Sequence, residues 1–336
     1  MNRGRKCAMN AGALAVFAFA VCALAPLSAV HAQSAPGPGA QAHRVVVGYP
    51  PGGASDIVAR LLAERLRDGT GEPFVVENKP GAGGRIAAEQ VKAAAPDGRT
   101  LMLAPVANFS IYPHTVDRLR YDPFRDFAPI ALAGSFDIGI ATGPATNAKT
   151  LAEFVAWVKA NPKQGSFGAP TAGSLPHFFG LLFAEAAGLE MVLVNYKGSG
   201  PAVNDVIGGQ LPAVSTTMSD LIAQHKSGRL RVLAHSGAQR NAQLPEVPTF
   251  KELGYRGLEG GGWYGLFATG GSPEAALNRY NAIVVRALQT QELRARFAAL
   301  GLEITLTTPQ QFARLIREDS DRWGKIIRAS GFKAEE

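Results

Sequence analysis

Two glycine-rich turns hold the residues of this sequence that are best suited to chemistry. The first turn, residues 49–56 (YPPGGASD), follows the apolar run 45–47, and the second, residues 171–177 (TAGSLPH), follows residues 166–168 (SFG). Each turn leads into an amphipathic helical pattern, so it directs unpaired backbone N–H groups and the positive end of a helix dipole toward one point. On two lobes that face one cleft, these turns would hold a small anion such as a carboxylate. The pattern predicts capture of a ligand rather than catalysis.

Several of these residues also have a purely structural interpretation. Gly52 and Gly53 allow close approach of the backbone to an anion, but they would equally form a simple tight turn. Asp56 either braces the loop or meets an ammonium group of the ligand, since an acidic residue is favourable in the first turn of any helix. His177 is either a binding residue or a packing residue. Tyr196, which opens a third glycine-containing turn, either flanks a ligand or closes the core.

The sequence has no motif typical of a cofactor, metal or catalytic site. Residues 81–84 (GAGG) follow a predicted strand, but Ile86 stands where a dinucleotide fingerprint needs its third glycine, and no acidic residue follows at the right distance. A phosphate-binding loop and a Gly-x-Ser-x-Gly elbow are both missing. The histidines from His43 onward are dispersed, without the spacing of metal ligands. We therefore expect no cofactor, no metal and no catalytic residue.

The N-terminus has the pattern of an export signal. A basic segment at residues 3–6 precedes a short apolar stretch at residues 11–25, and residues 30–32 (VHA) predict cleavage after Ala32. Residues 33–42 have linker composition and are expected to form a flexible leader. The signal peptide would thus comprise residues 1–32, and the product would be an exported, soluble protein.

The cysteine content and the net charge argue against several classes of protein. Cys7 and Cys22 both lie within the signal, so the mature chain has no thiol, disulfide or cysteine metal site. Cys22 could carry a lipid, but no lipobox precedes it, and the apolar stretch is short for an uncleaved membrane anchor. The formal net charge falls from +7 to +4 when the three cations of the signal are removed. Lysine and arginine are scattered and not interleaved with aromatic residues, so nucleic-acid binding is not expected.

Short β-rich runs alternate with longer helical patterns along the chain, as in parallel sheets with helices on both faces. In a first series, we expect strands at residues 45–49, 74–77 and 100–104 and helices at 56–66 and 85–95. In a second series, we expect strands at 137–142, 166–168, 191–196, 213–216 and 230–234 and helices at 151–160, 175–187, 201–207 and 219–226. The tail is expected to be helical at 273–290, 291–300 and 309–330. Ser174 suits the N-cap of the helix at 175–187, and Gly188 suits its left-handed end.

The two series predict a two-lobed α/β fold in which one lobe is inserted into the other. Lobe I would comprise residues 43–135 and 262–336, and lobe II residues 136–261. Two crossing strands near the glycine-containing segments 134–136 and 260–262 would form a hinge. Each lobe would hold a mainly parallel sheet flanked by helices. The alternative is a single continuous sheet with a loop-rich edge.

Several sequence blocks, in fixed order over the whole mature chain, resemble the tripartite tricarboxylate transporter receptors, also called Bug-type periplasmic solute-binding proteins. The blocks are 49–56 (YPPGGxxD), 76–84 (VENKPGAGG), 95–101 (APDGRTL), 196–198 (YKG), 208–210 (GGQ), 230–234 (LRVLA), 244–250 (LPEVPTF) and 263–266 (WYGL). The resemblance implies a periplasmic-binding-protein fold, a Venus flytrap that closes on a small organic acid and then docks on the membrane permease of a tripartite tricarboxylate transporter. It implies a monomeric, periplasmic protein that is not an enzyme. A sensory partner without transport and an exported enzyme acting on an organic acid are the alternatives.

The resemblance also implies where the ligand binds. In the family, the turn holding residues 52–54 and the turn holding residues 171–174 contact the ligand carboxylate, partly through bound water. The family often has an aspartate near the strand end where this chain has residues 215–218 (STTM), which puts in doubt any ligand with a positive group on that side. The predicted ligand-binding residues are Tyr49, Pro51, Gly52, Gly53, Ala54, Asp56, Ala104, Asn108, Thr171, Ala172, Gly173, Ser174, His177, Tyr196, Gly198 and Thr216.

Overall fold

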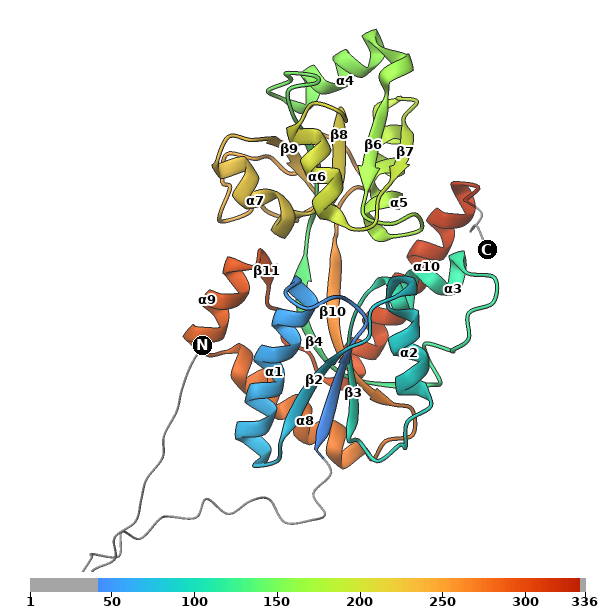
Figure 1. The fold of residues 1–336 in the computed structure, drawn as a ribbon, viewed down its shortest axis with the longest axis vertical. Helices are drawn as coiled ribbons and strands as arrows, with labels where there is room; N and C mark the ends of the chain where they lie inside the picture. The colour runs from blue at the N-terminus through green and yellow to red at the C-terminus, as the bar shows by residue number, and fades with distance from the viewer. Residues whose placement is uncertain (1–41, 333–336) are drawn as a thin grey trace, which may run out of the picture. The chain divides into compact units, whose positions relative to one another are not determined.

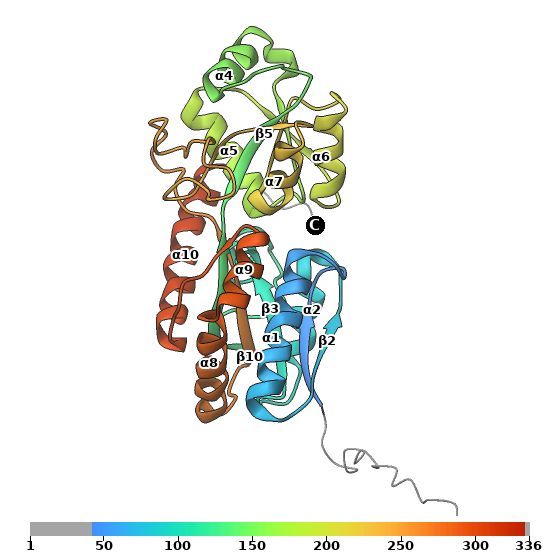
Figure 2. The ribbon, with the colours of Figure 1, turned by 90° about the vertical axis from the view of Figure 1, so that its left-hand side faces the viewer.

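The computed structural model describes residues 42–332, which form two β-sheets flanked by helices (Figures 1 and 2). The predicted signal peptide, its cleavage site after Ala32 and residues 33–41 of the predicted leader lie outside the described residues. Within the described part of the chain, none of the helices combines the length and the apolar character that a bilayer crossing needs. The two-lobed α/β fold predicted from the sequence is confirmed.

The first sheet has six strands in the order β11-β4-β10-β3-β1-β2. Its strands and the helices around it are β1 (His43–Val47), α1 (Ala54–Thr70), β2 (Phe74–Asn78), η1 (Ala82–Gly84), α2 (Arg85–Lys92), β3 (Thr100–Pro105), η2 (Ala107–Ile111), α3 (Tyr112–Thr115), β4 (Phe127–Phe136), β10 (Gly262–Thr269), α8 (Glu274–Leu288), α9 (Gln291–Ala299), β11 (Leu302–Glu303) and α10 (Pro309–Ala329). The three consecutive valines of β1 are fully buried, because helices cover both faces of the sheet. We call this part of the molecule the first lobe.

The second sheet has five strands in the order β7-β6-β8-β5-β9. Its elements are β5 (Ile138–Thr142), α4 (Leu151–Ala160), η3 (Pro162–Gln164), β6 (Ser166–Ala169), α5 (Leu175–Ala187), β7 (Val192–Asn195), α6 (Ser199–Ile207), β8 (Ala213–Thr217), α7 (Met218–Lys226) and β9 (Arg231–His235). The predicted ends of α5 are confirmed. Ser174 caps the helix by accepting a hydrogen bond from the His177 N–H, and Gly188 ends it in the left-handed region at φ 62°. We call this part the second lobe.

Both sheets are mixed, whereas the sequence predicted mainly parallel ones. The β–α alternation was correctly interpreted for β2-β1-β3 and for β7-β6-β8, which pair in parallel. The antiparallel pairs arise because β10 is inserted between β3 and β4, and β5 between β8 and β9. In the first sheet β10 is antiparallel to β3 and β4, and β11 is antiparallel to β4, while in the second sheet β5 is antiparallel to β8 and β9.

The chain crosses between the lobes twice, at adjacent points. It leaves the first sheet at Phe136 and enters the second at Ile138, and it returns to the first sheet at Gly262, which pairs with Phe136 in the β4–β10 ladder. A Cβ at Gly261 would collide with the carbonyl oxygen of Phe136, so only glycine permits this approach. The two crossing strands expected from the sequence are therefore neighbours in one ladder.

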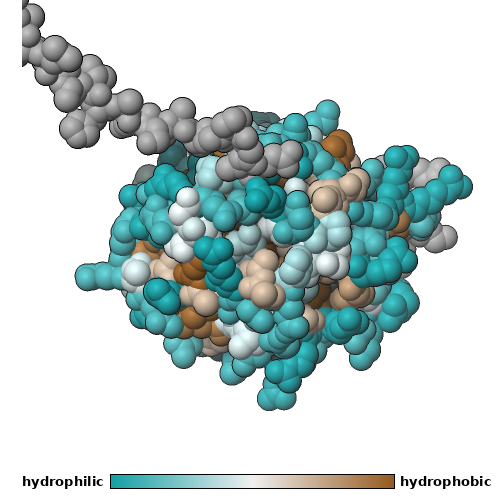
Figure 3. Space-filling view, turned by 90° about the horizontal axis from the view of Figure 1, so that it is seen from below, coloured by the Kyte–Doolittle hydropathy of each residue, from teal (hydrophilic) through white to brown (hydrophobic). Residues whose placement is uncertain are grey.

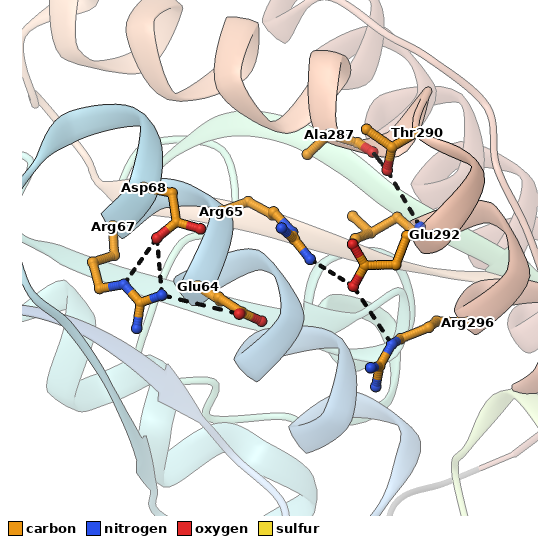
Figure 4. A network of polar contacts seen from close by, with 9 residues as sticks. Glu64, Arg65, Arg67, Asp68, Ala287, Thr290, Glu292 and Arg296 are labelled. Carbon is orange, nitrogen blue, oxygen red and sulfur yellow. Dashed lines mark hydrogen bonds and ion pairs between the residues drawn. The ribbon is translucent and has the colours of Figure 1, made fainter.

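The lower end of the first lobe has a largely hydrophilic surface. Figure 3 shows this end, where hydrophilic residues predominate and apolar ones occur singly or in small groups. On the side of α1, polar contacts join this helix to α9 (Figure 4). Arg65 of α1 donates to Glu292 at 2.8 Å, and Glu292 lies 3.8 Å from Arg296 on its own helix. Each of these half-exposed pairs contributes little to the free energy of unfolding. The lobe is stabilised mainly by its apolar core.

Candidate functional site

A cleft of about 920 Å³ lies between the two lobes. One wall comes from the first lobe, from the start of α2 and from α3 with the residues that follow it. The other comes from the second lobe, from the turn before α5 and from β7. The residues that line the cleft are Ala82, Gly83, Arg85, Tyr112, Thr115, Val116, Asp117, Arg118, Thr171, Ala172, Gly173, His177, Leu193, Asn195 and Phe332. Its chemistry is mixed, with aromatic rings, two arginines and one aspartate.

The second glycine-rich turn has most of its main-chain donors occupied by the protein itself. Ala172 N–H donates to Asn195 Oδ1 at 2.7 Å, Gly173 N–H donates to His177 Nδ1 at 3.0 Å, and Ser174 N–H donates to the Thr171 carbonyl at 3.2 Å. These three groups were expected from the sequence to be available to an anion. In this conformation they instead fix the shape of the turn.

His177 is both a packing residue and part of the cleft wall. It is 3% exposed, and burial lowers its pKa to about 4 because the charged imidazolium would lose its hydration. The ring is therefore neutral near pH 7. Since Nδ1 accepts the Gly173 N–H, the ring proton lies on Nε2, and His177 can offer an N–H to a ligand.

The first glycine-rich turn differs, because its helix has no side-chain cap. Gly53 is the N-cap residue of α1, and its carbonyl accepts the Ile57 N–H. The N–H groups of residues 53–56 have no acceptor among the residues that the structure describes. They are the orphan donors of a 17-residue helix, at the positive end of its dipole. This end of α1 is thus able to bind an anion.

Asp56 braces the first turn. Its Oδ2 accepts the Gly52 N–H at 2.9 Å and Arg60 Nε at 3.0 Å, and its Oδ1 accepts Asn78 Nδ2 at 2.9 Å. The side chain is buried, which by itself would raise its pKa, but the hydrogen bonds from Arg60, Gly52 and Asn78 outweigh this effect and lower the pKa. Of the two interpretations left open by the sequence, these contacts favour loop bracing over an encounter with a ligand ammonium.

Tyr49 and Asn108 lie behind the cleft, at η1. The Tyr49 hydroxyl donates to the Gly83 carbonyl at 3.0 Å, and Asn108 Nδ2 donates to the same carbonyl at 3.4 Å. Asn108 is fully buried, and its Oδ1 has no partner among the described residues. Gly83 has φ 64°, and a side chain there would strike the Tyr112 hydroxyl. This polar layer supports the segment that carries Gly83 into the cleft.

Arg85 places a guanidinium in the cleft wall. Its Nε donates to the Ala82 carbonyl at 2.9 Å, and its Cζ lies 5.8 Å from the centroid of the Tyr112 ring. No carboxylate of the described residues lies within ion-pair distance of it. Arg85 is therefore positioned by the backbone and an aromatic ring and keeps its terminal nitrogens available.

The structure gathers only some of the predicted ligand-binding residues in the cleft. Thr171, Ala172, Gly173 and His177 line it, and Ser174 caps the adjoining helix. The first turn, from Pro51 to Ala54, is largely exposed and does not line this cavity. Both turns were expected to share one cavity, and here they do not.

The remaining predicted residues take part in contacts within their own lobes. Ala104 is fully buried in β3 opposite Gly265. The Tyr196 hydroxyl donates to Asp205 at 2.6 Å, and Thr216 donates to Asp220 at 2.8 Å. Gly198 N–H donates to the Pro170 carbonyl at 2.8 Å, which ties the third turn to the second.

Sequence reasoning missed several residues of the cleft wall, namely Arg85, Tyr112, Thr115, Asp117, Arg118, Asn195 and Phe332. Arg85 directly follows a glycine-rich turn and Asn195 ends a strand, so both had a local signal. Tyr112 and Thr115 belong to a short helical segment with no periodic pattern. Phe332 follows the last helix of the chain, and only the tertiary structure brings it to the cleft.

Comparison with known proteins gives one consistent family. Residues 58–332 match the family described as tripartite tricarboxylate transporter family receptor. The chain is 34% identical to BugT of Bordetella pertussis over 86% of this chain and 89% of that protein. It resembles MatC from Rhodopseudomonas palustris, solved with bound malate, at 30% identity and a TM-score of 0.76 over 85% of this chain and 98% of that one. A second R. palustris protein, solved with adipate, gives 26% identity and a TM-score of 0.81 over 88% and 98%.

Proposed function

Because the chain belongs to the tripartite tricarboxylate transporter receptors, a family of periplasmic binding proteins and not enzymes, we propose that it captures a small carboxylate-bearing metabolite between its lobes. Two relatives were solved with malate and with adipate, both of which carry carboxylates. The chemistry of this chain's own cleft supports a ligand of that class.

The observation that carries the proposal is the set of orphan N–H groups at residues 53–56. Four donors at the start of a long helix attract a carboxylate by hydrogen bonding and by the helix dipole. The Thr171 turn and the Nε2–H of His177 belong to the wall of the cleft and give it a polar surface. Arg85 adds a positive charge to the cleft wall.

We propose that the lobes comprise residues 43–135 with 262–336 and residues 136–261, and that they close about the crossing strands. Closure would bring the first turn into the cavity that the second turn already lines. The anion would lose water as it meets these donors, and each contact would strengthen in the lower dielectric. Since closure needs a ligand that binds the shut state more tightly, the ligand would shift an existing equilibrium between open and closed forms.

The cellular role follows from the family. We propose that the protein is exported to the periplasm, works as a monomer and presents its ligand to the membrane permease of a tripartite transporter. The predicted cleavage after Ala32 belongs to this proposal. The test in the cell is loss of ligand uptake when the permease gene is deleted, whereas a sensory role would leave uptake unchanged.

A binding screen tests the ligand class directly. Purified protein would be tested by thermal shift against dicarboxylates, aromatic acids and amino acids, with the uncharged amide of each hit as a control. We expect a carboxylate to raise the melting temperature and its amide to have no effect, because only the anion interacts with the dipole end of α1. Equal shifts from acid and amide would reject the proposal.

A further inference from the structure

The last helix of the chain connects the two lobes at the cleft. Helix α10 is fixed to the first lobe: Ser110 Oγ donates to the Ile316 carbonyl at 3.2 Å, and His114 Nε2 lies 2.9 Å from Ser320 Oγ. In Figure 1 it rises along the first lobe, past α3, and its upper end lies beside the second lobe at the level of α5; Figure 2 likewise shows it reaching the second lobe. Its C-terminal end is therefore well placed to act on the second turn.

Phe332, just beyond α10, makes this contact. Its ring lies 5.2 Å from the His177 ring at an interplanar angle of 70° and 5.2 Å from the Phe178 ring at 86°. These edge-to-face arrangements are favourable for aromatic pairs. A Cβ built on Gly173 would lie 3.5 Å from the Phe332 ring and 3.9 Å from Thr115 Oγ1. Phe332 thus covers the glycine of the second turn while it lines the cleft.

The contact between Phe332 and His177 also affects the conformation of the second turn. His177 Nδ1 accepts the Gly173 N–H, so the orientation of the imidazole helps to set the conformation of the turn, where Gly173 has φ 75°. The Phe332 ring restricts where that imidazole can lie. A first-lobe element therefore acts through one ring on the main chain of the second lobe.

We propose that Phe332 is a specificity-determining and positioning residue, which holds His177 against the second turn and limits the length of the ligand that the cleft accepts. This inference rests on the proposed function, because it assumes that the ligand binds in this cleft. A ligand extending past His177 toward the end of α10 would meet the Phe332 ring. Removal of the ring would open that side of the cleft and leave the imidazole less restrained.

The test is Phe332→Ala in the full chain, with Phe332→Tyr as the conservative variant. Phe124→Ala is the matched control, since Phe124 is an exposed phenylalanine of the same lobe that does not line this cleft. Binding of straight-chain mono- and dicarboxylates of increasing length would be measured by calorimetry. We expect Phe332→Ala to lower affinity for short acids about tenfold and to raise the relative affinity for long ones, while Phe332→Tyr and Phe124→Ala keep the wild-type order. An unchanged length preference in Phe332→Ala would overturn the inference.

A second measurement needs no ligand. The imidazole of His177 would be titrated by NMR in the wild type and in Phe332→Ala, with assignment by His177→Gln. Loss of the covering ring should hydrate the imidazole, so we expect its pKa to rise by at least one unit, and no change would overturn the positioning role. If the wild type binds no carboxylate at all, the proposed function fails. If it binds carboxylates but Phe332→Ala leaves both readouts unchanged, only this inference fails.

Discussion

The two glycine-rich turns look alike in sequence but differ in how their donors are used. At the start of α5, Ser174 caps the helix, and the main-chain N–H groups of the turn bond to Asn195, His177 and Thr171. At the start of α1, no side chain caps the helix, and a buried aspartate braces the loop from behind. The turn before α5 thus satisfies its own hydrogen-bond donors, whereas the turn before α1 retains donors without an acceptor.

Because of this difference, we expect substitutions in one turn to change ligand affinity and substitutions in the other to change stability. Anion binding should depend on the turn whose N–H groups lack acceptors, because a ligand there satisfies donors that the protein leaves open. Substitutions in the capped turn should instead affect the free energy of unfolding. The following predictions test whether the two effects separate in this way.

Asp56→Ala should have the largest effect, since it removes the brace of the uncapped turn. The Gly52 N–H and the Asn78 amide would lose a charged acceptor, at a cost of about 3 kcal/mol in the free energy of unfolding. Carboxylate affinity should fall with it, because the donors would no longer be held in one orientation. Chemical denaturation and calorimetry give the two values. Asp68→Ala, on an exposed part of α1, is the control and should change stability by less than about 0.5 kcal/mol.

His177→Gln should alter the pH dependence of stability. The folded state holds the His177 pKa near 4, below the value of 6.5 of an unperturbed histidine, so the unfolded chain binds a proton that the folded chain does not. The neutral His177 therefore stabilises the folded state above pH 6.5. This contribution to the free energy of unfolding falls by about 2–3 kcal/mol as the pH decreases from 6.5 toward 4. Glutamine can still accept the Gly173 N–H but does not titrate. Denaturation at pH 7 and pH 4 should show a smaller loss in the variant, and an equal loss would contradict the assignment.

Gly53→Val should weaken binding more than it weakens the fold. Gly53 has φ −78°, which any residue can adopt, and a Cβ there would have no neighbour closer than the Pro50 carbonyl oxygen at 3.8 Å. The side chain would stand beside the orphan donors and obstruct an incoming carboxylate. We expect at least a tenfold loss of affinity, or about 1.4 kcal/mol, with only a small fall in the melting temperature, because valine is a poorer N-cap residue than glycine. Unaltered affinity would remove the first turn from the binding site.

Ser174→Ala should have the smallest effect, and unlike Gly53→Val it should lower stability more than ligand affinity. Loss of the N-cap acceptor should cost about 1 kcal/mol of stability, or a melting temperature lower by about 2–4 °C. The affinity for a carboxylate should change less than in Gly53→Val, although Ser174 is among the ligand-binding residues predicted from the sequence. If Ser174→Ala weakens binding more than it weakens the fold, the contrast between the turns is wrong.

The sequence predicted the elements with local signals and missed those set by distant contacts. Helices α4 and α5 have the predicted bounds, and at α5 the reason is local: Ser174 is the N-cap, and Gly188 ends the helix in the left-handed region. The antiparallel strands β4 and β10 were expected only as a hinge, since their pairing partners lie more than a hundred residues apart. Four predicted site residues line the cleft because they lie in the turn between β6 and α5 or at the start of α5, namely Thr171, Ala172, Gly173 and His177.

Which donors remain unsatisfied could not be seen from the sequence. Both turns have glycine and a polar residue in the right order, and only the tertiary structure brings Asn195 to one turn and Asn78 to the other. The position of Phe332 in the cleft wall could not be predicted from the sequence either. No residue near it in the chain indicates a contact with the elements that form the cleft, such as α3 and α5.

The paired crossing strands restrict how the lobes can move. Gly262 and Phe136 face each other in one ladder, with Gly261 pressed against the Phe136 carbonyl, so the two connections cannot bend independently. Sliding of one lobe over the other would break that ladder, whereas a shared twist would preserve it. If the lobes close, we therefore expect a rotation about this shared ladder rather than a sliding movement, and a side chain at position 261 to interfere with it.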